Sequence, residues 1–161
     1  MRLFLSIIPL FLLSLTSYGM RNDDTTDQVV PPYVLNKQCV LVADDSALTR
    51  KTLYSTLKEM LPAEHAINLA TNPKDAWTLW NEYHPGLLIL DNSMPNENDG
   101  LHLIKRIRKS EGSQPLIILY SGDAVDISLP QTLDFVFVQK GSPPAILQRA
   151  IVDQHKRLNA N

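Results

Sequence analysis

The chain has 161 residues, 44% of them hydrophobic, which fits one compact domain with additional terminal segments. Its formal net charge is −2, without the basic excess typical of nucleic-acid-binding proteins, so we expect no nucleic-acid partner. The single cysteine, Cys39, excludes an internal disulfide and a cysteine-based zinc cluster. It lies in an apolar run, which predicts a buried structural thiol.

The N-terminal segment, residues 1–19, differs from the rest of the chain. Arg2 is followed by an uncharged apolar run and then by small residues, which is the pattern of a secretory signal peptide. The run is short for a membrane span and is interrupted by Pro9. A third interpretation is that Met20 is the true start, and the sequence leaves all three open. Residues 20–37 are polar and predict a flexible leader before a domain at 38–158.

Within that domain, short apolar runs alternate with amphipathic stretches. The apolar runs predict five buried strands, at 39–43, 67–70, 87–90, 115–120 and 135–138. The amphipathic stretches predict helices at 46–61 with Ser46 as N-cap, from Asn72-Pro73 onward, around 103–107, weakly at 123–131, and at about 143–158. The apolar stripes include Ala76, Trp80 and Tyr83 in the second helix and Ile146, Leu147, Ala150 and Ile151 in the last.

This alternation of strands and helices determines the expected fold class. Fully apolar strands separated by helices imply parallel βαβ units and a sheet covered on both faces. We therefore predict an α/β fold with a doubly wound, five-stranded parallel sheet. Its crossovers are right-handed, so ligands bind at the carboxyl ends of the strands.

Polar residues stand at four of those strand ends: Asp44 and Asp45, Asp91, Ser121, and Lys140. Each has a common structural role when taken alone, as a helix cap, a turn residue or a solvated strand end. The topology, however, brings all of them to one edge of the sheet. Clustered carboxylates repel one another and attract Mg²⁺, which also binds phosphate oxygens. An ammonium and a hydroxyl beside them predict a site that stabilises a transferring phosphoryl group.

The strand ends resemble the receiver domain of bacterial response regulators over about residues 38–158. The similar segments are VADDSALTRKTL, LLILDNSMP, LIILYSG and FVFVQK. The resemblance implies a flavodoxin-like (βα)5 fold and a signalling phosphoprotein rather than an enzyme. Asp91 would accept a phosphoryl group from a phosphohistidine of a sensor histidine kinase or histidine phosphotransfer protein.

The resemblance also implies roles for the surrounding residues. The Mg²⁺ ligands would be Asp44, Asp45, Asp91 and the backbone carbonyl of Ser93. Ser121 and Lys140 would contact the phosphoryl group. Ser121 and Phe137 would form the switch that alters the face made by the fourth helix, last strand and last helix. Gly122 would leave the site open to the donor.

Three features depart from the family pattern. The loop NEND at 96–99 is one residue longer than usual. Gly141 follows Lys140, where the family usually has proline after a cis peptide bond, and a cis bond before a non-proline residue costs about 2.5–4 kcal/mol. The fourth helix, at 123–131, is short and weak in propensity.

Two alternatives to a phosphorylated receiver stay open. One is a degenerate receiver that acts as a binding module, and the other is a metal-dependent phosphatase or other hydrolase. Against the second, a haloacid-dehalogenase-type enzyme would have an aspartate at the position of Ser93. The chain extends only a short way beyond Lys140, so we expect a stand-alone receiver that acts on an unknown downstream protein.

The cellular compartment and the histidines complete the sequence-based expectations. Transfer from an ATP-driven kinase requires the cytoplasm, so we expect a cytoplasmic protein, with export or membrane association through residues 1–19 as the alternative. The histidines show no ligand spacing, and we interpret them as solvated or capping residues. They are His65, His84, His102 and His155.

Overall fold

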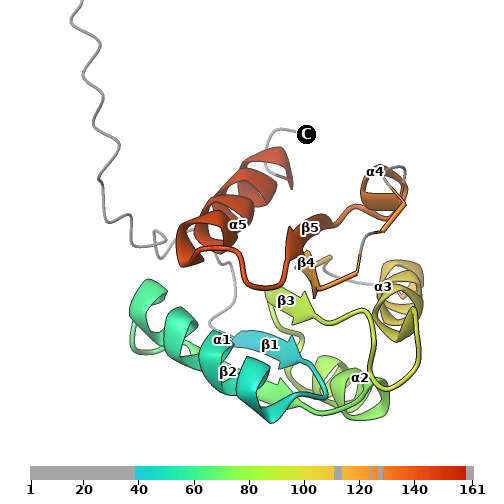
Figure 1. The fold of residues 1–161 in the computed structure, drawn as a ribbon, viewed down its shortest axis with the longest axis horizontal. Coiled ribbons are helices and arrows are strands. Elements are labelled where there is room, and N and C mark those ends of the chain that lie inside the picture. Colours follow the sequence, from blue (N-terminus) through green and yellow to red (C-terminus); the bar gives the residue numbers. More distant parts are fainter. Residues whose placement is uncertain (1–38, 111–113, 124, 127–128, 159–161) are drawn as a thin grey trace, which may run out of the picture.

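Five strands form one all-parallel sheet in a computed structural model of the chain (Figure 1). The structure describes residues 39–158 except 111–113, 124 and 127–128, so the predictions for 1–19 and 20–37 lie outside the described residues. The strand order is β2-β1-β3-β4-β5, which confirms the predicted doubly wound sheet. The strands are β1 (Cys39–Ala43), β2 (Ala66–Ala70), β3 (Leu87–Leu90), β4 (Leu116–Ser121) and β5 (Val136–Gln139).

Five helices connect and follow the strands. They are α1 (Ala47–Met60), α2 (Pro73–Tyr83), α3 (Asp99–Lys109), α4 (Leu129–Leu133) and α5 (Pro144–Leu158). The predicted caps are present: Ser46 Oγ accepts the amide of Thr49, and Asn72 Oδ1 accepts the amide of Asp75. The fourth helix is short, as predicted, but it begins later than expected: it spans Leu129–Leu133 and overlaps the predicted segment 123–131 only at 129–131. Pro130 lies in its first turn, where proline is tolerated, which is consistent with a helix that starts just before it.

Two hydrophobic layers hold the helices against the sheet. Helices α1 and α5 cover one face, and α2, α3 and α4 lie on the other (Figure 1). The first layer contains Leu53, Leu57, Leu147 and Ile151, and the second contains Trp80, Leu103, Ile104 and Ile107. Strand β3 is fully buried because both layers pack on it.

Two residues of the predicted apolar stripes lie outside these layers. Tyr83 is 48% exposed and Ile146 is 45% exposed. Tyr83 is the last residue of α2 and Ile146 belongs to the first turn of α5. Helix ends reach past the sheet they cover, so a side chain with the right spacing can still face solvent there.

Two polar side chains also differ from their predicted environments. His65 is only 3% exposed, so the interpretation of this histidine as solvated is wrong. Its backbone is held by two hydrogen bonds: the His65 amide donates to Pro62 O, and its carbonyl accepts from Lys58 Nζ. Cys39 is half-buried rather than buried, and its Sγ accepts from the Asn68 side-chain amide at 3.2 Å. His84 is the left-handed C-cap of α2, as a capping residue should be.

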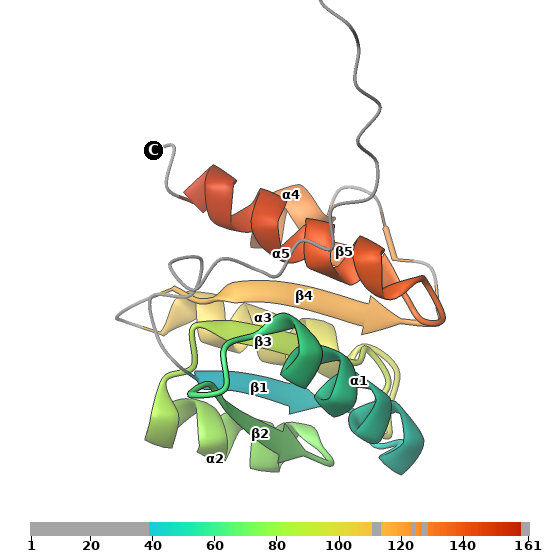
Figure 2. The same cartoon turned by 90° about the vertical axis from the view of Figure 1, so that its left-hand side faces the viewer.

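The parallel topology brings the carboxyl ends of the strands to one edge. The arrowheads of β1 and β4 point the same way, toward the end where α1 and α5 begin (Figure 2). Among the residues that the structure describes, no helix is both long enough and apolar enough to cross a membrane.

Candidate functional site

The acidic pair at the end of β1 is held by the turn into α1. Asp44 is 1% exposed, and its Oδ1 accepts the Ser46 amide at 2.8 Å. Asp45 is exposed. Arg50 Nη1 donates to the Asp44 carbonyl at 2.7 Å and to the Asp45 carbonyl at 3.0 Å. This clamp fixes the backbone that carries both carboxylates, and Arg50 was not among the residues predicted from the sequence.

Lys140 joins the ends of β1 and β3. Its Nζ lies 2.9 Å from Asp44 Oδ2 and 2.8 Å from Asp91 Oδ2. The two aspartates are close because the Asp91 amide donates to the Ala43 carbonyl at 2.8 Å, which extends the β1–β3 ladder. Asp91 is 4% exposed, so the ammonium compensates two carboxylates that have little contact with water.

Three aspartates form a group suited to a metal ion. Carboxylate oxygens of Asp44, Asp45 and Asp91 all lie within 4.8 Å of one another. Hard divalent cations prefer carboxylate oxygens as ligands, so the chemistry of this donor set fits such a cation. The structure thus brings together the three carboxylates that the sequence predicts as metal ligands.

The remaining predicted site residues occupy the same edge or lie beside it. Ser121 is buried at the end of β4, where its Oγ accepts the Asp123 amide at 3.3 Å. Ser93 is half-buried in the loop after β3. Phe137 is half-buried and packs on the layer that includes α4. Gly122 is exposed, and a Cβ there would meet nothing within 4 Å, so this side of the site is open as predicted.

Gly100 allows α3 to approach the loop that contains Asp91. A Cβ at this position would lie 2.1 Å from the Asp91 carbonyl oxygen, an overlap with rigid backbone. The Gly100 amide donates to Asn92 O at 3.1 Å in the same contact. The longer loop before it is accommodated by Asn98, whose φ is +66°, and by a hydrogen bond from the Asn96 amide to Asp99 Oδ2. The insertion therefore leaves the approach of α3 to Asp91 intact.

The turn after Lys140 has no cis bond at the position where the family usually has one. The cis peptide bond of the described residues is Met94–Pro95. Gly141 instead has φ +85°, and the Ser142 amide donates to the Gln139 carbonyl at 3.2 Å. A positive φ at the third residue of such a turn is the pattern of type II and favours glycine.

The architecture and the acidic edge agree with one known family. Residues 40–142, more than half of the chain, match the response regulator receiver domain. The chain belongs to this family. Membership identifies the receiver as a module of two-component signalling, while the expected lack of enzymatic activity stays a prediction.

Several relatives share this domain. The virulence transcriptional regulatory protein PhoP of Salmonella typhimurium is 38% identical to the receiver over 80 residues, which is 50% of this chain and 34% of PhoP. The chain thus spans about a third of the length of its curated relatives. The receiver domain from Bermanella marisrubri is 25% identical, with a TM-score of 0.59 over 73% of this chain and 98% of that one.

A yeast receiver shows the same fold. The receiver domain of Ssk1 from Saccharomyces cerevisiae, solved with the histidine phosphotransfer protein Ypd1, is 18% identical, with a TM-score of 0.61 over 76% of this chain and 91% of that one. Because the PhoP relatives are named transcriptional regulators, the predicted absence of a nucleic-acid partner stays a prediction.

Burial and the ion pair have opposite effects on the pKa of Asp44 and also on the pKa of Lys140. Burial raises the pKa of Asp44 above 3.8, although the hydrogen bond from Lys140 opposes this. For Lys140, burial acts to lower the pKa, but hydrogen bonds to Asp91 and Asp44 outweigh it and raise the pKa above 10.5. The ammonium is therefore charged at neutral pH, whereas burial makes the charged form of Asp44 costly to the fold.

We expect the substitution Asp44→Asn to stabilise the receiver at neutral pH without divalent cations, by roughly 0.5–2 kcal/mol. Asp44 has a higher pKa folded than unfolded, so the folded state binds its proton more tightly. Wild-type stability therefore falls as the pH rises from 3.8 through the raised folded pKa. Asparagine removes this loss, retains an acceptor for Ser46, and leaves Lys140 paired with Asp91.

Urea unfolding at several pH values measures this effect. The gain should be larger at neutral pH than in acid and should shrink as the pH falls toward 3.8. Asp153→Asn, at an exposed position of α5, is the control and should show no such gain. Destabilisation of the Asp44→Asn protein at neutral pH would mean that the Lys140–Asp44 ion pair outweighs the cost of burial.

Proposed function

We propose that the receiver accepts a phosphoryl group on Asp91 from a phosphohistidine donor, in a reaction that requires Mg²⁺. The observation that carries the proposal is the position of Lys140, whose ammonium contacts Asp44 and Asp91 at once. A cation placed between a nucleophilic carboxylate and a metal-binding carboxylate is suited to the charge of a transferring phosphoryl group.

Asp91 is the nucleophile in this proposal. Its Oδ2 is paired with Lys140, and the attack on phosphorus comes from Oδ1. A bond forms between Oδ1 and phosphorus while the bond between phosphorus and the donor imidazole breaks, and the imidazole nitrogen keeps that electron pair. The product is an acyl phosphate on Asp91.

The neighbouring residues stabilise and orient the group. Asp44, Asp45, Asp91 and the Ser93 carbonyl would hold Mg²⁺, which neutralises charge on phosphoryl oxygens when bound. Ser121 would donate its hydroxyl to another phosphoryl oxygen in place of accepting the Asp123 amide. Lys140 stays beside Asp91 and pairs with the acyl phosphate.

Output would follow from the movement of Ser121. Phe137 lies two strand positions before Gln139, on the side of the sheet that α4 covers, and it is half-buried. We propose that it shifts as Ser121 turns toward the phosphoryl group, which changes the α4–β5–α5 face. This face would contact a downstream protein, and a cytoplasmic location would give the receiver access to its donor.

Incubation of the wild-type receiver with acetyl phosphate tests the proposal. We expect uptake of one phosphoryl group in intact-mass spectra when Mg²⁺ is present, no uptake with EDTA, and release by hydroxylamine, which cleaves acyl phosphates. An unlabelled protein at saturating Mg²⁺ would instead indicate a binding module. Steady turnover of p-nitrophenyl phosphate without a labelled protein would indicate a hydrolase.

A further inference from the structure

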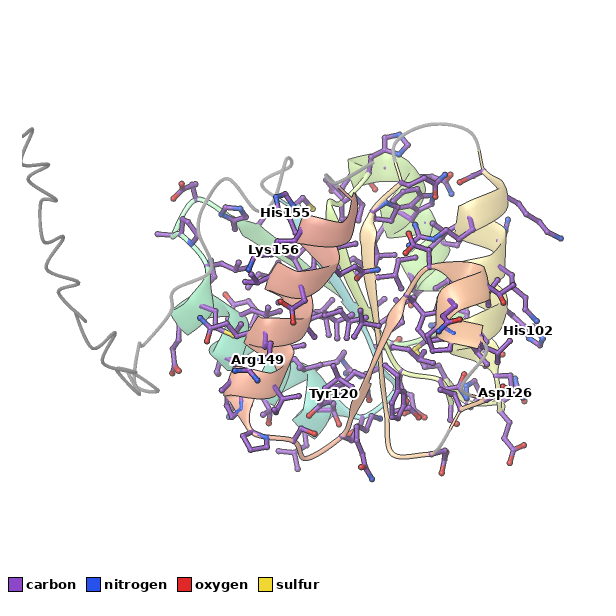
Figure 3. The ribbon with its side chains drawn as sticks, turned by 90° about the horizontal axis from the view of Figure 1, so that it is seen from above. His102, Tyr120, Asp126, Arg149, His155 and Lys156 are labelled. Atoms are coloured by element: carbon purple, nitrogen blue, oxygen red, sulfur yellow. The ribbon has the colours of Figure 1, made fainter. Side chains whose placement is uncertain are left out.

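Tyr120 is a polar aromatic residue beside the phosphoacceptor site to which the proposed chemistry assigns no role. It precedes Ser121 in β4 and pairs with Val138 of β5. Its half-buried ring packs against the layer formed with α1 and α5. Figure 3 shows Tyr120 on the side of the sheet that α5 covers, close to where α5 begins. The core therefore fixes the ring, and the hydroxyl reaches the edge of the sheet.

The hydroxyl of Tyr120 meets the turn that follows Lys140. The Gly141 amide donates to Tyr120 Oη at 3.2 Å, across 21 residues of sequence. Proline, which the family usually has at this position, carries no amide hydrogen. The departure at Gly141 thus creates a donor, and Tyr120 supplies its acceptor.

This contact bears on Lys140 because Gly141 is its immediate neighbour. The Lys140 backbone is held from one side by its own amide, which donates to the Ser121 carbonyl at 2.9 Å. On the other side the Gly141 amide is held by Tyr120. The Lys140 stem is long and has several rotatable bonds, so a fixed backbone at its base favours the geometry in which its ammonium contacts both carboxylates.

We propose that Tyr120 is a positioning residue for Lys140. Its hydroxyl anchors the Lys140–Gly141 turn and so holds the ammonium between Asp44 and Asp91. The hydrogen bond between Tyr120 and Gly141 thus restrains a turn that a proline ring would restrain in the usual family pattern. The effect on phosphoryl transfer rests on the function proposed above, whereas the anchoring of the ammonium does not.

NMR on the Tyr120→Phe protein tests the anchoring directly. Phenylalanine keeps the ring and removes the acceptor. We expect faster hydrogen exchange of the Gly141 amide and of the Lys140 ammonium, by about two- to tenfold, the range of one neutral hydrogen bond. Tyr54→Phe removes the hydroxyl of another tyrosine, on α1, and should change neither signal. Unchanged exchange of the Lys140 ammonium in Tyr120→Phe, even with faster exchange of the Gly141 amide, would overturn the proposal, whatever the phosphorylation result.

A double-mutant cycle tests the consequence for transfer from acetyl phosphate. Tyr120→Phe should slow phosphoryl uptake about two- to tenfold in the wild-type background at saturating Mg²⁺. In a Lys140→Ala background the same substitution should have no further effect, because the group it positions is gone. Equal slowing in both backgrounds would show a general structural role and contradict the proposal. A wild type that takes no label would contradict the proposed function and the transfer role, but the exchange measurement would still decide the anchoring.

Discussion

Phosphoryl uptake from acetyl phosphate should be abolished in the Asp91→Asn protein. An amide is a far weaker nucleophile than a carboxylate, so no acyl phosphate can form at that position. The fold should persist, because Lys140 keeps its contact with Asp44. The substitution also removes a negative charge from a buried position, and the asparagine carbonyl can still accept a hydrogen bond there. Intact-mass spectrometry at saturating Mg²⁺ measures the loss.

The matched control for this substitution is Asp153→Asn. It makes the same chemical change at an exposed position of α5 and should leave uptake at the wild-type rate. Persistent uptake in Asp91→Asn would place the acceptor on another residue. Loss of uptake in both proteins would indicate a general effect of removing one negative charge.

Lys140→Ala should slow uptake by about 10²–10³-fold, the loss seen when one preorganised donor to a developing charge is removed. It should also destabilise the protein, since Asp44 and Asp91 are buried and lose their shared cation. Removing one partner of a buried ion pair costs about 3–5 kcal/mol, and we expect about 3 kcal/mol or less here because the Lys140 side chain is 27% exposed.

Divalent metal separates the two effects of Lys140→Ala. Mg²⁺ bound among the aspartates supplies positive charge, so it should restore much of the lost stability in urea unfolding while uptake stays slow. Lys51→Ala, at an exposed position of α1, should leave both quantities unchanged. If Mg²⁺ restored the rate as well, Lys140 would serve the fold and not the transfer.

The fold and the acidic edge were predictable because both depend on simple repeating patterns. Continuous apolar runs mark strands that are buried on both faces, and β3 is fully buried as its run predicts. In a parallel sheet the carboxyl ends of all the strands lie at the same edge. The contact of Lys140 with Asp44 and Asp91 therefore follows from topology, although the residues are far apart in sequence.

Residues that act through the backbone were not predictable in the same way. Gly100 matters because α3 approaches the Asp91 carbonyl, and Arg50 because its guanidinium reaches two carbonyls. Neither contact leaves a periodic pattern in the sequence. In the sequence, Tyr120 is indistinguishable from any other aromatic residue of a strand. Its proposed role depends on Gly141, which lies 21 residues later at a position where the family usually has proline. The burial of His65 likewise has no periodic signal, since it lies in the short connection between α1 and β2, where it is only 3% exposed.

The most direct test of the central claim is to locate the phosphoryl group in the wild-type receiver. Borohydride reduces an acyl phosphate of aspartate to homoserine, which marks the acceptor for peptide mass spectrometry. After treatment with acetyl phosphate and Mg²⁺, we predict homoserine at position 91, and aspartate at that position when Mg²⁺ is omitted. An unreduced Asp91 in a protein that has taken up phosphate, or homoserine at another position, would contradict the account.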